Sequence, residues 1–114
     1  MYRPADLFAW VAFVVLQPTI EELAFRGLLQ GQLLRLTQKR QMAGVSMANV
    51  LTTAVFVAMH LQSQQPAWAL AAGVPSLVLG HLRERLVSVI PAMALHMIYN
   101  GGFALVAWWV PQIH

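Results

Sequence analysis

Apolar residues dominate this chain, and charged residues interrupt them at only a few places. The ten residues Leu7–Leu16 are all apolar, and no Asp, Glu, Lys or Arg occurs between Arg40 and Arg83 or after Arg85. A transmembrane helix needs about 20 predominantly apolar residues. We therefore predict an all-α integral membrane bundle of about four transmembrane helices, forming one domain over residues 1–114. The expected helices run from residue 4 through Pro18 to about 40, and over 43–61, 66–82 and 86–109.

The composition of the chain indicates that lipid surrounds these helices. The chain is 59% hydrophobic and 10% charged, whereas an ordinary soluble domain is roughly 25% charged. So few polar side chains could not cover a soluble particle. The opening apolar run is expected to be a retained span and not a signal peptide, because Asp6 offsets Arg3 and no small-residue cleavage site follows.

Basic residues occur at helix ends and predict a topology. Five of them fall in two connections that share one side of the predicted bundle: Arg35, Lys39, Arg40, Arg83 and Arg85. Cytoplasmic loops carry an excess of Lys and Arg, so this side is expected to be cytoplasmic in a bacterial inner (plasma) membrane. The basic residues form no patch interleaved with aromatic residues, and we expect membrane lipid and no nucleic acid as a partner.

A few strongly polar residues lie inside the predicted spans. A charge at the centre of a spanning helix costs about 2.5–3.5 kcal/mol on insertion scales. Such residues must therefore be paired or hydrated, and we expect them to face the interior of the bundle. The set consists of Glu21, Glu22, Arg26, His60, His96 and Asn100.

Helical spacing groups these residues into pairs. Glu22 and Arg26 are four residues apart, which places them on one face within reach of an ion pair. Glu21 lies about 100° around the helix from its neighbour and is freer to point elsewhere. His96 and Asn100 share one face of the last helix. Carboxylates, imidazoles and an amide together can activate water and stabilise the charge that develops during hydrolysis.

Each of these groups also has a purely structural interpretation. Glu22 and Arg26 could form only a structural ion pair, and His60 could lie at the membrane interface. His96 and Asn100 could form hydrogen bonds between helices. The occurrence of all of them on three helices of one short chain favours a functional site.

Three short motifs resemble those of a known family. They are E-E-x-x-x-R over residues 21–26, F-x-x-x-H over 56–60 and H-x-x-x-N over 96–100. In this order and on predicted spans, they are similar to the motifs of the CPBP family of intramembrane proteases. That family includes CAAX proteases and bacteriocin-processing proteins, and its shared region is often called the Abi domain. Type II CAAX prenyl endopeptidases belong to it. The resemblance covers roughly residues 15–102.

The resemblance implies an intramembrane endopeptidase acting near the C-terminus of a membrane-associated or lipid-modified protein. Glu21 would be the general base for a water held against His60, while His96 and Asn100 would donate hydrogen bonds to the oxyanion. The adjacent ion pair would fix the helix and tune the base. A non-enzymatic immunity or scaffold protein with the same fold is the alternative.

Metal dependence stays open at this point. Glu21, His60 and His96 could supply the three protein ligands of a catalytic zinc. The usual H-E-x-x-H arrangement, with two histidines on one helical turn, does not occur in the sequence. We therefore favour a glutamic mechanism without metal or other cofactor. A bis-histidine haem site from His60 and His96 is less favoured, because carboxylates adjoin it.

Overall fold

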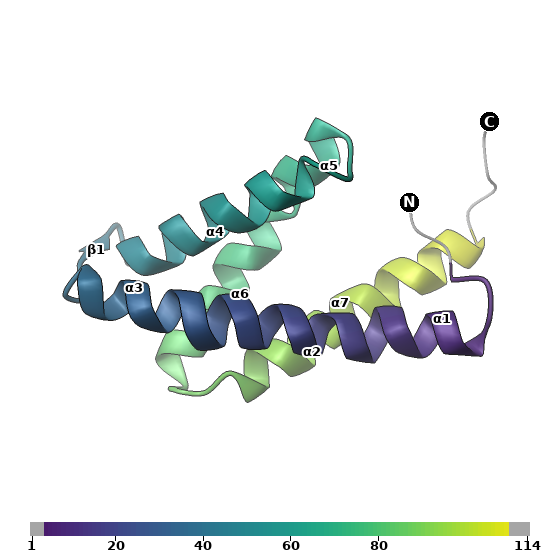
Figure 1. Cartoon of the computed structure of the whole chain (residues 1–114), viewed down its shortest axis with the longest axis horizontal. Helices are drawn as coiled ribbons and strands as arrows, with labels where there is room; N and C mark the ends of the chain where they lie inside the picture. Colours follow the sequence, from purple (N-terminus) through teal and green to yellow (C-terminus); the bar gives the residue numbers. More distant parts are fainter. Residues whose placement is uncertain (1–3, 110–114) are drawn as a thin grey trace.

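The computed structural model describes residues 4–109, and its longest element is one unbroken helical rod over Leu7–Leu36 (Figure 1). The Asp6 side chain caps the start of this rod by accepting a hydrogen bond from the Ala9 N–H at 2.8 Å. The rod alternates between α-helical and π-helical segments. These are α1 Leu7–Val11, η1 Ala12–Leu16, α2 Gln17–Glu22, η2 Leu23–Leu29 and α3 Gln30–Leu36.

Pro18 does not interrupt the rod, although a proline inside a helix removes one backbone donor. The Gln17 N–H bonds to Ala12 O, five residues back, which is the π register. In that register Phe13 O would pair with residue 18, and proline has no N–H to offer. The Asn100 side chain of another helix donates to Phe13 O at 2.9 Å. The missing donor is thus replaced from outside the helix.

A short hairpin follows the rod, and the sequence patterns did not predict it. Strands β1 Gln41–Met42 and β2 Val45–Ser46 pair antiparallel. Ala43 and Gly44 form the turn with φ of 52° and 81°, as tight two-residue hairpins require. Helix α4 Met47–His60 then begins, and the Ser46 side chain caps it by accepting from the Asn49 N–H. Our prediction of a span over 43–61 is therefore too long, since α4 has 14 residues.

The span expected over residues 66–82 consists of two helices in the structure. Helix α5 Pro66–Ala71 ends at Ala72, and α6 Gly73–Arg85 follows directly. The last helix, α7 Ile90–Trp109, starts four residues later than predicted. Pro91 lies in its first turn, where a proline costs no hydrogen bond within the helix. Among the described residues, the rod and α7 are the two helices long and apolar enough to cross a membrane.

The distribution of side chains is the reverse of that in a soluble protein. Large apolar residues such as Phe8, Ile98 and Trp109 are 80%, 67% and 86% exposed. Buried positions are mostly occupied by alanine or by polar residues. Small residues at helix contacts and apolar residues outside are characteristic of helices in lipid. The predicted all-α architecture is confirmed, with two helices of spanning length where we expected about four.

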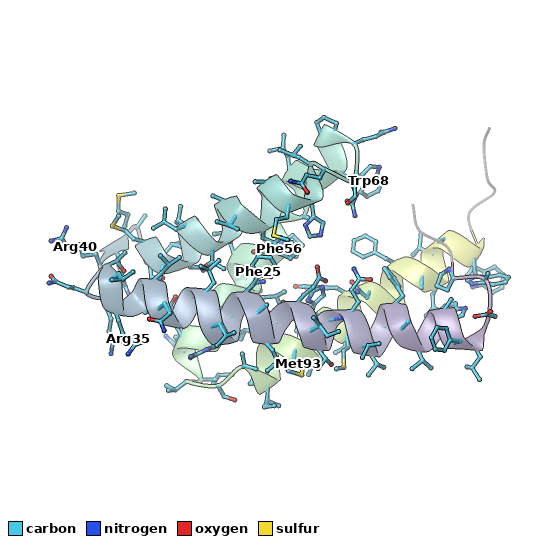
Figure 2. All side chains as sticks on the ribbon, in the orientation of Figure 1. Phe25, Arg35, Arg40, Phe56, Trp68 and Met93 are labelled. Atoms are coloured by element: carbon cyan, nitrogen blue, oxygen red, sulfur yellow. The ribbon has the colours of Figure 1, made fainter. Side chains whose placement is uncertain are left out.

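The helices pack closely where small residues allow it. A Cβ atom on Gly80 of α6 would collide with the Asn49 side chain of α4 as it is placed here, so glycine allows this close approach. Asn49 Nδ2 in turn donates to Leu77 O at 2.9 Å. Figure 2 shows Phe25 and Phe56 between the rod and α4, where their rings meet edge to face at 5.3 Å.

The basic residues gather at one end of the molecule. Arg35 and Arg40 lie at the end that carries β1, far from α5 (Figure 2). Arg83, near the end of α6, reaches the rod and donates from Nε to Arg26 O at 3.1 Å. This agrees with our placement of the two basic connections on one side. Arg3, which we assigned to the opposite side, lies outside the described residues.

Candidate active site

The centre of the candidate site is a carboxylate with no exposed surface, Glu22 of α2. Its Oε2 accepts a hydrogen bond from Arg26 Nη1 at 3.2 Å and another from His96 Nδ1 at 2.8 Å. The ion pair expected from the four-residue spacing is therefore present. The contact with His96, 74 residues away in the chain, joins the rod to α7.

Arg26 is fully buried and held on several sides. Its Nη2 donates to Ser76 O at 2.6 Å and also to the Ser76 hydroxyl. The guanidinium carbon lies 5.4 Å from the centroid of the Phe56 ring, a cation–π distance. The buried pair thus fixes the rod against α4 and α6 as well as against α7.

Glu21, the neighbouring carboxylate, points in a different direction. Its side chain is 20% exposed, and its Oε1 lies 3.7 Å from Nε2 of His96. That separation is longer than a hydrogen bond. His96 therefore stands between two carboxylates, with Nδ1 on buried Glu22 and Nε2 facing the more accessible Glu21.

The contacts define which ring nitrogen of each histidine carries hydrogen. A carboxylate oxygen accepts, so His96 Nδ1 is the donor to Glu22. His60 Nδ1 lies 2.8 Å from Phe56 O, which can also only accept. In its neutral form, His60 consequently presents an unprotonated Nε2. Fixing one nitrogen by a backbone or carboxylate acceptor sets the chemistry of the other.

A cavity of about 660 Å³ brings these groups to a common space. Glu21, His60, His96 and Asn100 all line it, although they come from three helices. His60 is the last residue of α4. The structure places it at the same cavity, with its ring tilted against the Phe56 ring at a centroid distance of 4.1 Å. Trp68 borders the cavity from the α5 side (Figure 2).

Asn100 borders the cavity but also has a structural contact. Its Nδ2 donates to Phe13 O. In the π register this carbonyl would pair with residue 18, which is a proline and has no N–H. The helix-to-helix hydrogen bond that we considered from the sequence is thus present. Only one of the two amide hydrogens is needed for it.

Comparison with known protein families places the chain. A family model described as type II CAAX prenyl endopeptidase Rce1-like matches residues 3–102. The chain belongs to this family. The matched region includes all three motifs, so the resemblance identified from them is confirmed. No curated protein and no solved structure matched the chain.

The donors of this Rce1-like chain do not form a three-ligand metal site as they are arranged here. Within residues 4–109, no three His, Asp or Glu side chains stand close enough to hold one ion. Glu21 and His96 face each other, while His60 lines the cavity from α4. We derive no catalytic step through a metal.

The sequence patterns did not predict two buried polar residues of this Rce1-like chain, Gln30 and Ser76. Gln30 is fully buried and donates to Gly80 O at 3.0 Å and to the Glu84 carboxylate. It follows Arg26 by four residues, so continuing the Glu22–Arg26 spacing by one turn would have found it. Ser76, the partner of Arg26, had no comparable signal, because its role depends on how α6 packs against the rod.

Proposed function

We propose that this protein is an intramembrane endopeptidase that hydrolyses a peptide bond near the C-terminus of a membrane-anchored or lipid-modified protein. Membership of the CAAX prenyl endopeptidase family supports a peptidase with a membrane-associated protein substrate. The observation that carries the mechanism is the position of His96 between two carboxylates at a cavity wall. A bacterial inner membrane is the proposed location.

The proposed role of His96 requires a hydrogen on both of its ring nitrogens. Glu21 and Glu22 carry two negative charges, and Arg26 carries one positive charge. An imidazolium at His96 brings this group to neutrality, which matters because an uncompensated buried charge is costly. Since Nδ1 is bonded to Glu22, the second N–H of the imidazolium points from Nε2 toward Glu21 and the cavity.

Hydrolysis then proceeds with the chain's own groups. Glu21 takes a proton from water, and the water oxygen bonds to the scissile carbonyl carbon. The resulting oxyanion accepts a hydrogen bond from His96 Nε2–H, a type of donor worth about 10²–10³ in kcat. The C–N bond breaks as Glu21 passes its proton to the leaving nitrogen. The direct products are a carboxylic acid and an amine, the acid then gives its proton to the amine to leave a carboxylate and an ammonium ion, and Glu21 is regenerated.

His60 has a supporting part in this proposal. Its neutral Nε2 can accept the second hydrogen of the attacking water, while Nδ1 is held by Phe56 O. A water held between Glu21 and His60 would have a lone pair directed at the substrate. Glu22 and Arg26 hold His96 in place and do not touch the substrate.

Cleavage of a farnesylated CAAX peptide by the purified protein in nanodiscs tests this proposal. We expect the wild-type protein to release the C-terminal tripeptide, and Glu21→Gln to bind the peptide without cleaving it. In cells, a deletion strain and a Glu21→Gln strain should accumulate the same uncleaved protein C-termini. Cleavage by Glu21→Gln at the wild-type rate would refute the mechanism. Full rescue of a deletion phenotype by Glu21→Ala would favour the non-enzymatic scaffold.

A further inference from the structure

Gln17 is a polar side chain that nothing in the fold uses. It follows ten consecutive apolar residues in the rod and is exposed. Within residues 4–109, no hydrogen bond to its side chain is formed. An amide without partners is costly in an apolar environment, so this position calls for a polar ligand or solvent.

The side chain borders two hollows of the protein. One is the cavity of about 660 Å³ that holds Glu21, His60 and His96. The other is an adjoining hollow of about 320 Å³ along the rod. The two share three residues, Phe13, Gln17 and Glu21. An extended peptide that runs from one hollow into the other must pass over this stretch of the rod.

Gln17 also has a fixed relation to the proposed base. Gln17 and Glu21 are the first and fifth residues of α2, and side chains at this spacing have Cβ atoms about 5–6 Å apart on one helix face. A carboxamide offers both a donor and an acceptor, which match the N–H and C=O of a peptide bond. The geometry is that of a backbone clamp beside the reacting carbonyl.

Other carboxamides at the cavity are less suited to this task. Asn100 uses Nδ2 to bond Phe13 O. Gln64 and Gln65 lie in the turn after α4, near the cavity rim, and no regular helix fixes their distance from Glu21. Gln17 alone among these four stands one helical turn from the base.

We infer that Gln17 is a substrate-binding residue, whose carboxamide holds the peptide backbone of the substrate next to the scissile bond. This inference rests on the proposed function. It assigns to the site a substrate segment that is extended where it crosses the rod, with its polar backbone groups paired to Gln17 and its carbonyl presented to Glu21.

The test measures steady-state cleavage of a farnesylated CAAX peptide by Gln17→Met, which keeps the length of the side chain and removes both polar groups. We expect KM to rise at least tenfold while kcat changes by less than about threefold, because binding and not proton transfer is lost. Gln62→Met is the matched control. Gln62 lies in the same loop as Gln64 and Gln65, which line the cavity, but it does not line the cavity itself. It should behave as the wild-type protein does.

Two further measurements separate this inference from its alternatives. If Gln17→Met lowers thermal stability, the role of Gln17 is tested with Gln17→Glu. This variant keeps the size and polarity of the side chain but has no hydrogen-bond donor, and its affinity for the peptide is measured. That affinity should also fall at least tenfold. An unchanged KM or affinity in a folded variant overturns the role of Gln17 and leaves the endopeptidase intact. Failure of the wild-type protein to cleave the peptide would overturn the proposed function itself.

Discussion

His96 bonds to Glu22 and not to Glu21: its Nδ1 is 2.8 Å from Glu22 Oε2, whereas its Nε2 is 3.7 Å from Glu21 Oε1. Two adjacent residues of the same type therefore have separate tasks. The fully buried carboxylate organises the site, and the partly exposed one faces the cavity and is available for chemistry.

This division predicts that the two glutamine variants differ in thermal stability. Glu21→Gln should abolish cleavage and lower the melting temperature less than Glu22→Gln does, because the residue is partly exposed and has no close hydrogen bond. Glu22→Gln should lower the melting temperature as well, since Arg26 would remain buried without its counter-charge. Breaking a buried ion pair from one side costs about 3–5 kcal/mol. Thermal unfolding in detergent compares the two, and equal stability losses would contradict the division.

Arg26 tests the same network from the cationic side. Arg26→Ala should impair membrane accumulation and cleavage together, because it leaves Glu22 unpaired and removes the contacts to Ser76. Arg26→Lys keeps the charge but cannot reach Glu22 and Ser76 with a planar fork, so an intermediate loss is expected. Quantitative blotting of membranes alongside peptide cleavage measures both. A fully active, normally inserted Arg26→Ala would show that the pair is dispensable.

Gly80 should be intolerant of even one added carbon. Gly80→Ala places a methyl group on the Asn49 side chain. Either Asn49 moves and loses its hydrogen bond to Leu77 O, or α4 and α6 separate, at a cost of about 1–3 kcal/mol. Gly102→Ala is the matched control, because a Cβ there has no atom within 4 Å. In α7 it should be neutral or stabilising by up to about 1 kcal/mol. Chemical unfolding of both variants gives the comparison, and similar stabilities would argue against the close contact.

The predicted topology can be tested with single cysteines, because the sequence contains none. Gln38→Cys, in the basic connection, should react with an impermeant maleimide only after the membrane is permeabilised. Gln64→Cys, at the opposite end of α4, should react in intact cells. Labelling of both positions from the same side would overturn the topology.

The metal-free mechanism makes its own prediction. Protein purified in metal-depleted detergent should cleave the farnesylated peptide at the same rate before and after treatment with a chelator. Zinc content determined by mass spectrometry serves as the control. Activity that is lost on chelation and restored by stoichiometric zinc would instead assign Glu21, His60 and His96 to a metal.

Local spacing determined which parts of this structure could be predicted. The Glu22–Arg26 pair follows from one helix, so the four-residue interval was sufficient. The contact of His96 with Glu22 depends on how α7 crosses the rod, and no sequence pattern encodes that crossing. The length of α4 was overestimated because Ala43 and Gly44 belong to a stretch without charged residues, from which a span beginning at residue 43 was predicted. Only the positive φ angles of their turn show where the hairpin ends and α4 can begin.

The hydrogen bond from Asn100 to Phe13 O has a consequence for the lipid around this protein. A helix of 30 residues is about 45 Å long, more than the roughly 30 Å of a hydrocarbon core, and such a helix adapts by tilting. Asn100 lies one turn beyond His96 on α7, so we expect a change of tilt at Phe13 to shift the turn that carries the imidazole. We therefore expect the rate of peptide cleavage to depend on acyl-chain length, so that the same folded protein turns over at different rates in thin and thick bilayers.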